Sequence, residues 1–313
     1  MEGLKSQLTA FLDLHGFEFT ALTRSGLEVL YVKSLVNSDM KCIVPLSLEA
    51  TSPFQAENNA DALESLLHDL YEEDIIPIVI AEDRWRLQGN MMRERLLAHL
   101  ERFTSLYARN CEVRKIDKET AAMFLDDNHS YGDATCRYRY GLYLKRYTGK
   151  WAQISPLALL GRNDNDGVME YGGGNDYVAP GTLVAVATFS NARKWQKGDK
   201  VIRSYEWTRY ASLPGVRISG GMGKVLKAFI EEVHPDDIMS YADLEWSEGK
   251  VYEQLGFVME GRKDPVMFVV DEAWRRFPVK PGMTEASGGG MTAKRFFQNL
   301  GSNKYRLKLT QYE

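Results

Sequence analysis

The fold of this chain is decided by residues Tyr205 to Gly261, which read YEWTRYASLPGVRISGGMGKVLKAFIEEVHPDDIMSYADLEWSEGKVYEQLGFVMEG. The stretch predicts a strand, a glycine-rich turn, an amphipathic helix, a second strand, a polar loop and a short helix, followed by a third strand. Gly220, Gly221 and Gly223 stand where the first strand gives way to the helix. A helix that begins in this way presents free backbone N–H groups at its N-terminus, and these favour phosphate-like anions. The turn is therefore a candidate phosphate site.

The rest of this stretch carries two further patterns. Residues 223–233 place apolar side chains on one helical face, so we expect this helix to pack on a sheet. Residues 238–242 predict the next strand, with Asp243 at its exit. Tyr252 lies on the short helix, just before the corner Leu255-Gly256-Phe257.

Length and composition predict two globular domains. The chain has 313 residues, of which 44% are hydrophobic and 26% charged, and single cores rarely grow past about 250–300 residues. The first 110 residues carry 10 Lys and Arg against 17 Asp and Glu, whereas residues 111–313 carry 29 against 26. This asymmetry supports an acidic domain over 1–110 and a mildly basic domain over 111–313, and the second domain is the one expected to meet a polyanion.

Other features of the sequence bear on where the protein works. The N-terminus has no basic-then-apolar signal pattern, and no apolar run approaches membrane-spanning length. Cys42, Cys111 and Cys136 lie far apart without CxxC spacing, which indicates reduced thiols rather than disulfides or a zinc site. We therefore expect a cytoplasmic protein without a membrane partner and without a bound metal.

The first 110 residues predict a small α/β domain. Its expected elements are a helix over 4–14, a hairpin of strands over 17–22 and 27–32, a strand over 42–46, a helix over 60–71, a strand over 75–80 and a helix over 90–103. The succession PIVIAEDRW, MMRERLLAHLERF, SLYARNCEVRKI and FLDDNHSYG resembles the middle of phage-encoded Hef-like homing-endonuclease proteins. Those proteins join a nuclease-like domain to a C-terminal acetyltransferase-like domain.

Nuclease chemistry of the restriction type needs an Asp and a Glu-x-Lys pair around a divalent metal. Glu28 and Lys33 stand on the predicted hairpin but at the wrong spacing, and no Asp precedes them in a suitable strand. We interpret residues 1–110 as a nuclease-like scaffold without its metal site, which leaves an active nuclease as the weakest hypothesis.

Residues 111–313 predict the second domain. Its expected elements are a strand over 111–116, a helix over 118–128 capped by Asp117, strands over 137–145, 181–189 and 204–211, and a last clear strand over 266–270. Residues 161–180 are rich in Gly and Asn and predict an insertion loop, and residues 191–200 predict a polar turn.

The glycine turn, the strand SYAD and the corner YEQLGF together resemble the GNAT-like acyl-CoA acyltransferases, over most of residues 111–275. SYAD followed by VYEQLGFVMEG is also similar to phage Mom-type DNA-modification proteins, which share that fold and modify adenine. The resemblance implies an α+β domain with a mixed, splayed sheet that binds acetyl-CoA or another acyl-CoA between two strands. Its function would be transfer of the acyl group to an amine, with a nucleobase amine as one candidate.

The family pattern for the phosphate turn is Gln/Arg-x-x-Gly-x-Gly/Ala. Arg217 and Gly220 fit its first half, but Met222 occupies the last position, and Gly221 with Gly223 fits only when the register moves by one. The cofactor-binding residues that the resemblance implies are Arg217, Gly220, Gly221, Gly223 and Lys224. An ordinary tight turn is the alternative interpretation of the glycines.

Acyl transfer from a thioester to an amine needs a base for the attacking nitrogen and an acid for the leaving thiolate. Tyr252 matches the tyrosine that supplies the acid in the resembling enzymes, and the alternative is an ordinary packed helix residue. Asp243 is a candidate base or substrate-orienting residue, and the alternative is a cap for the turn that follows it. His129 resembles the histidine of the Mom-type pattern, and imidazole suits a base near neutral pH, although a lone His is more often structural.

Six further residues are candidate contacts for substrate or nucleic acid: Glu206, Arg209, Tyr241, Lys304, Arg306 and Lys308. The last three belong to a basic, aromatic-bearing C-terminal tail whose alternative interpretation is a solvated closing strand. A non-catalytic, DNA-binding or mobile-element accessory protein is therefore the second hypothesis, and it makes DNA the partner in place of a small-molecule thioester.

Overall fold

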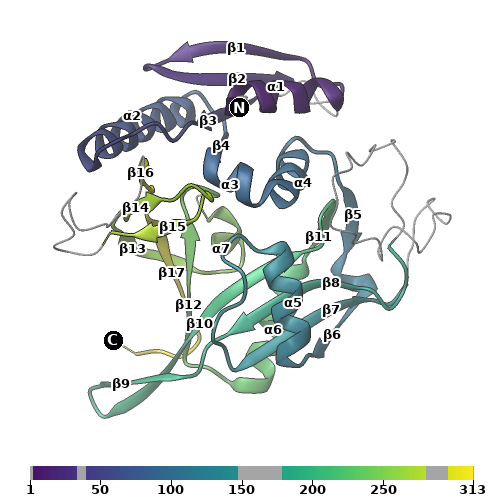
Figure 1. Cartoon of the computed structure of the whole chain (residues 1–313). Helices are drawn as coiled ribbons and strands as arrows, with labels where there is room; N and C mark the ends of the chain where they lie inside the picture. Colours follow the sequence, from purple (N-terminus) through teal and green to yellow (C-terminus); the bar gives the residue numbers. More distant parts are fainter. Residues whose placement is uncertain (1–2, 34–39, 147–177, 248, 280–294, 313) are drawn as a thin grey trace. The chain divides into compact units, whose positions relative to one another are not determined.

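The computed structural model (Figure 1) describes residues 3–33, 40–146, 178–247, 249–279 and 295–312. It is a mixed α/β chain, as its sequence predicts. The chain divides into two compact units, residues 1–102 with 237–312, and residues 103–236. The charge asymmetry of the sequence predicted a single domain boundary near residue 110. In the structure the first unit is discontinuous, because residues 237–312 belong with the first 102 residues. Most of the predicted insertion, residues 161–177, lies outside the described residues.

The first unit begins with a four-stranded mixed sheet in the order β1-β2-β3-β4. Strands β1, β2 and β3 are antiparallel, and β4 runs parallel to β3. The strands are β1 (Phe19–Arg24), β2 (Leu27–Lys33), β3 (Met40–Leu46) and β4 (Pro77–Ala81). The helices are α1 (Leu4–Leu14), α2 (Pro53–Glu72), α3 (Glu82–Leu87) and α4 (Gly89–His99).

Two cores cover the two faces of this sheet. Leu30, Ile43 and Ile80 pack with buried leucines of α1 and α4, while Val29 and Val44 pack with those of α2. Alternate strand residues thus face different helices, as the period-two pleat requires. The predicted helix over 90–103 is shorter than expected, because α4 ends at His99 and Glu101 adopts a left-handed backbone with φ of 65°.

The same unit contains two further groups of strands near the C-terminus. An antiparallel set runs β13-β17-β12, and a second set runs β15-β14-β16. The elements are β12 (Asp237–Asp243), α7 (Lys250–Gln254), β13 (Val258–Lys263), β14 (Met267–Val270), β15 (Arg276–Pro278), β16 (Arg295–Gln298) and β17 (Ser302–Lys308). Lys304, Arg306 and Lys308 of the predicted basic tail therefore lie on β17, the middle strand of its set.

The second unit is an antiparallel sheet in the order β6-β7-β8-β10, with one helix on each face. Ala121 and Leu125 of α5 pack on Val186 and Ala211, and Phe229 of α6 stacks on Phe189 at 3.9 Å between ring centres. The elements are β5 (Thr104–Tyr107), a short 3₁₀ turn η1 (Ala108–Asn110), β6 (Cys111–Lys115), α5 (Lys118–Asn128), β7 (Tyr138–Leu144), β8 (Leu183–Phe189), β9 (Arg193–Lys197), β10 (Lys200–Ser212), β11 (Val216–Ser219) and α6 (Gly221–Val233).

Two features of this unit differ from the sequence prediction. Residues 191–200, expected to form a polar turn, contain β9, which forms a hairpin with β10 through Gly198 and Asp199. In addition, β5 and β11 form a parallel pair that was not predicted and that leads directly into α6. Across the parts of the chain that the structure describes, none of the helices is both long enough and apolar enough to cross a membrane.

Candidate functional site

The glycine turn lies between β11 and the N-terminus of α6. Gly220 is the N-cap, with a left-handed backbone at φ of 75°, and no side chain caps the helix. The N–H groups of Gly221, Met222 and Gly223 have no acceptor within the helix, because they belong to its first turn. A Cβ at Gly221 would lie 2.7 Å from Tyr210 Oη and 3.0 Å from Ile218 Cγ2. The second glycine therefore allows a close approach of α6 to β10 and β11.

The charges around this turn favour an anion. The first turn of α6 contains no acidic residue, and Arg217 on β11 is exposed, with its guanidinium 5.4 Å from the Phe103 ring centre. Lys224 Nζ donates to the carbonyl oxygens of Ala108 at 2.7 Å and Cys111 at 2.6 Å. Free backbone N–H groups and the positive end of a helix dipole favour phosphate-like anions, so this N-terminus is a candidate anion site.

Tyr252 lies on α7 against two residues of the neighbouring strands. Ser240 Oγ on β12 donates to Tyr252 Oη at 2.8 Å. The Tyr252 ring stacks on Tyr305 of β17 with 5.3 Å between ring centres. Burial raises the pKa of Tyr252, and the Ser240 hydrogen bond opposes this increase. The phenol is thus held as a neutral acid that already has a donor to stabilise its deprotonated form.

Asp243 ends β12, the strand that also carries Ser240. Its Oδ1 accepts a hydrogen bond from Glu245 N at 3.0 Å, and its carbonyl oxygen accepts from Trp246 N at 2.9 Å. These bonds are those of a turn cap, the alternative that the sequence left open for this residue. Tyr241 lies two positions earlier on β12, and Lys263 Nζ lies 3.6 Å from its ring centre.

His129 is the C-cap residue of α5 in the second unit. Its Nδ1 accepts a hydrogen bond from Tyr131 N at 3.1 Å, which holds the imidazole against the loop after the helix. Arg209 of β10 reaches the same loop, since its Nε donates to Gly132 O at 3.0 Å, and burial lowers the pKa of this guanidinium. Glu206 Oε2 lies 3.5 Å from Arg193 Nη2, whereas Arg209 bonds to Gly132 O, so the two side chains have different partners.

Two buried polar atoms on the loop after α5 and on β7 were not predicted from the sequence. Asp133 Oδ1 and Arg139 Nε are buried and have no hydrogen-bond partner among the residues that the structure describes. Arg139 and Arg209 are both register partners of Thr188 on the intervening strand, and Arg139 Nη2 donates to Cys136 O at 2.8 Å. The sequence Gly132-Asp133 did not predict this group of side chains, because the other members, Arg139 and Arg209, come from two separate strands.

The basic residues of β17 are largely paired with acids. Arg306 donates to Glu260 Oε1 at 2.7 Å and to Asp237 Oδ1 at 2.5 Å, and its side chain is only 11% exposed. Lys304 Nζ lies 3.2 Å from Glu260 Oε2, and Lys308 Nζ lies 5.0 Å from the Tyr312 ring centre. Within the described part of the chain this strand therefore presents much less positive charge than its sequence indicates.

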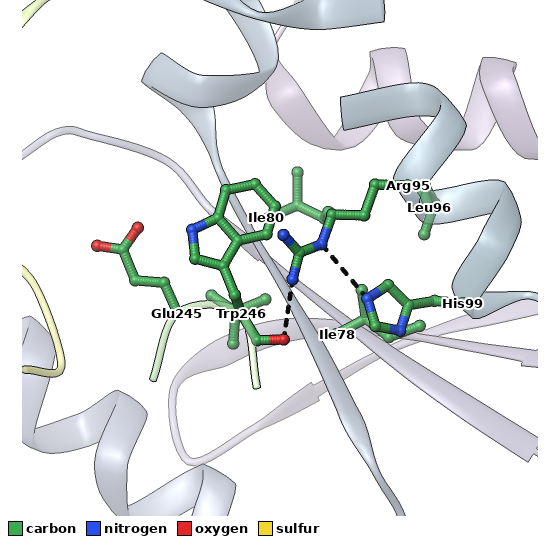
Figure 2. Close-up of a pocket in the computed structure, with 8 residues that line it drawn as sticks. Ile78, Ile80, Arg95, Leu96, His99, Glu245 and Trp246 are labelled. Atoms are coloured by element: carbon green, nitrogen blue, oxygen red, sulfur yellow. Dashed lines mark hydrogen bonds between the residues drawn. The ribbon is translucent and has the colours of Figure 1, made fainter. Parts of the chain in front are cut away.

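Figure 2 shows a small pocket in the first unit, between β4, α4 and the residues that follow β12. Arg95 lies over the Trp246 ring at 3.3 Å from its centre, and its Nη2 donates to Trp246 O at 3.0 Å. Its Nε donates to His99 Nε2 at 3.4 Å, and burial lowers the pKa of Arg95 to about 9. Ile78, Ile80 and Leu96 supply the apolar lining, so the pocket is a packed junction with little free space.

Within the described residues, no group of three or more His, Cys, Asp or Glu side chains is arranged to hold a metal ion. The predicted site residues fall into both units: Tyr241, Asp243, Tyr252 and the β17 residues belong to the first, and His129, Glu206, Arg209 and the glycine turn belong to the second. No protein-family model matches this chain. A search of curated proteins likewise finds no match.

Proposed function

We propose that the chain is an acyl-CoA-dependent N-acyltransferase that transfers an acyl group from the thioester to an amine. The observation that carries this proposal is the N-terminus of α6, where Gly220 begins the helix without a side-chain cap and without an acidic residue in the first turn. Such a terminus binds the diphosphate of a nucleotide cofactor through backbone N–H groups. Arg217 and Lys224 add positive charge beside it.

The reaction requires two proton transfers. The amine nitrogen attacks the thioester carbonyl carbon, the carbon–sulfur bond breaks, and the nitrogen gives up one proton to a base. The leaving thiolate takes one proton from an acid, so the products are an amide and a free thiol. The resemblance assigns the role of the acid to Tyr252, and two properties of this residue suit that role: burial raises the pKa of its phenol, and Ser240 donates a hydrogen bond to the phenol oxygen.

His129 is the candidate base. The Nδ1 lone pair of His129 accepts a hydrogen bond from the Tyr131 N–H, so the neutral imidazole carries its proton on Nε2, and His129 takes up a substrate proton only when Nδ1 releases this bond.

The test is release of free thiol from acetyl-CoA in the presence of a panel of amines, which includes single-stranded DNA homopolymers and free nucleosides. The proposal expects thiol release and acyl-amine formation with at least one amine, and expects both to be lost when the amine is omitted. If no amine in the panel supports thiol release and the protein has no affinity for a CoA thioester, the proposal is wrong.

Binding to DNA without thioester consumption would instead favour the accessory-protein hypothesis. Its affinity would fall steeply with salt concentration, because phosphate contacts release counterions. The ion pairs of Lys304 and Arg306 with Glu260 and Asp237 weigh against this outcome, since they neutralise the strand expected to meet the phosphates.

A further inference from the structure

A buried set of charged side chains in the first unit holds the turn that follows β12. This turn, residues 244–247, leads from Asp243 to the helix that carries Tyr252. Its two central side chains, Glu245 and Trp246, are both bound by residues distant in the sequence. Glu245 is only 5% exposed, although it is a carboxylate.

Arg276 on β15 bridges Glu245 to the first part of the chain. Its Nη1 donates to both Glu245 oxygens, at 2.7 and 2.9 Å. Its Nη2 donates to Asp83 Oδ1 at 2.9 Å, and its Nε donates to Asp83 Oδ2. The side chains of Arg276, Asp83 and Glu245 are 7%, 1% and 4% exposed, so the bridge is almost fully removed from solvent. The guanidinium also lies 4.1 Å from the Phe297 ring centre.

Arg95 on α4 holds the next residue of the turn. Its guanidinium covers the Trp246 ring and donates to the Trp246 carbonyl oxygen, as Figure 2 shows. The Trp246 side chain in turn packs against the core formed by α1, α4 and the first sheet. Two successive residues of one turn are thus fixed by α3 and α4, through Asp83 with Arg276 and through Arg95.

Ser247, the last residue of the turn, links the turn to the helix that carries Tyr252, because its Oγ accepts a hydrogen bond from Gly249 N at 2.9 Å. Gly249 precedes α7 with φ of 89°, and a Cβ there would overlap a ring carbon of Tyr305. Tyr305 is the residue on which Tyr252 stacks, and Tyr252 N donates to Gly249 O at 2.8 Å. Displacement of the turn would therefore move Gly249 against Tyr305 and shift the phenol away from Ser240.

We infer that Asp83, Arg95 and Arg276 are positioning residues for Tyr252, and that the first 102 residues supply part of the acyltransferase scaffold. The role of Tyr252 as the acid rests on the proposed function, whereas the positioning of the Tyr252 side chain by these three residues does not. Removal of one partner of a buried ion pair is strongly destabilising, because it leaves the other charge buried without compensation.

The experiment compares Arg276→Lys and Asp83→Asn with the matched control Arg275→Lys. Arg275 is the neighbouring residue, its side chain is 62% exposed, and it pairs with Asp271 outside the bridge. Hydrogen exchange followed by mass spectrometry reports the peptide 249–257, and steady-state kinetics with acetyl-CoA report turnover. We expect at least tenfold faster exchange in that peptide and at least a tenfold lower kcat for both bridge variants, with KM for acetyl-CoA within twofold of wild type. The control should change neither.

Each outcome decides the inference. Unchanged exchange in residues 249–257 overturns it, and so does faster exchange with an unchanged kcat, which would mark the bridge as structural only. If Arg276→Lys fails to fold, the milder Asp83→Asn, which keeps the size of the side chain, provides the same two readouts. If the wild-type chain transfers no acyl group, the proposed function fails, while the exchange measurement still shows whether the bridge holds the Tyr252 helix.

Discussion

At Tyr252, burial and a hydrogen bond act on the phenol in opposite directions. Burial disfavours the phenolate and raises the pKa, whereas the Ser240 hydroxyl stabilises the phenolate and lowers it, and the net change is upward. For an acid with a raised pKa, the protonated form persists to higher pH than for a free tyrosine. This behaviour suits a group that must deliver a proton and then recover it.

We predict that Tyr252→Phe lowers turnover by about 100-fold or more, the range typical for loss of a general acid, and leaves the Kd for acetyl-CoA within twofold. Because the pKa of Tyr252 is raised, the wild-type rate should show no loss of the acid as pH rises through 9 to 10. The pH–rate profile and a calorimetric titration check both statements. A variant with full turnover, or with turnover and affinity lost together, would contradict this role.

The three cysteines support a second prediction about single residues. Cys42, Cys111 and Cys136 are buried free thiols, and burial raises the pKa of each, that of Cys42 to about 11. A raised thiol pKa means that the reactive thiolate is scarce at pH 8. The native protein should therefore react with fewer than one equivalent of a disulfide reagent at pH 8, and with three after denaturation. Rapid native reaction of all three would show that they are accessible.

Single residues were predictable from sequence where their partners are local. Asp117 was expected to cap a helix, and its side chain accepts from Thr120 N at 2.7 Å. The partners of Lys224 and Arg306 were not predictable, because they lie 113 and 69 residues away, respectively, in the sequence. The sequence shows that a Lys or Arg side chain is present, but it does not show whether a carbonyl or carboxylate oxygen already accepts a hydrogen bond from it.

Among the elements, α2 shows how capping sets the start of a helix. Its apolar pattern was clearest from residue 60 onward, yet the helix begins at Pro53, because Ser52 accepts from Gln55 N at 3.3 Å and Pro53 fits the first turn. Most of residues 53–59 are polar or exposed, so periodicity alone could not reveal them. The Ser-Pro-x-Gln pattern was the available signal.

We predict that Ser52→Ala destabilises the protein by about 1 kcal/mol, the usual cost of a lost N-cap. Ser6→Ala on the exposed face of α1 is the control and should leave the stability within about 0.5 kcal/mol. Urea unfolding followed by circular dichroism measures both. Equal midpoints for the two variants would show that the Ser52 cap contributes nothing.

The contact between α6 and β10 supports a further prediction. Gly221→Ala should destabilise the protein by about 1–3 kcal/mol, because the new methyl group meets Tyr210 Oη at 2.7 Å and Ile218 within about 3 Å. The double variant with Tyr210→Phe should recover part of this loss, since it removes the nearest atom. Gly261→Ala, where a Cβ meets nothing within 4 Å, is the matched control. Thermal unfolding of the four proteins would contradict the account if Gly221→Ala were neutral.

For the molecule as a whole, the charge asymmetry of the sequence indicated two parts, but it did not indicate which segments of the chain belong to each part. Trp246 packs against the core of the first sheet, and Leu300 belongs to the core under α2. Both residues lie more than 130 positions after the predicted boundary near residue 110. Packing between segments so distant in the sequence leaves no trace in composition or periodicity, whereas the strand and helix types of most long segments were predicted.

We therefore predict that residues 111–313 expressed alone do not fold cooperatively. The truncation removes α1, α2 and α4, which cover Trp246 and Leu300, and it removes Leu46 and Leu48, which pack with Phe297. Calorimetric unfolding should show no sharp transition, while the full chain shows one. A truncated protein with a native near-ultraviolet spectrum and a sharp transition would instead establish 111–313 as an independent domain.

The most direct test of the proposed activity is a calorimetric titration of the full chain with acetyl-CoA, alongside acetyl-pantetheine, which has the same thioester arm without the diphosphate. If the N-terminus of α6 binds the diphosphate, acetyl-CoA should bind with micromolar affinity and acetyl-pantetheine at least about 100-fold more weakly, a loss of about 2.7 kcal/mol. Absence of heat with acetyl-CoA, or equal affinity for the two compounds, would contradict the account.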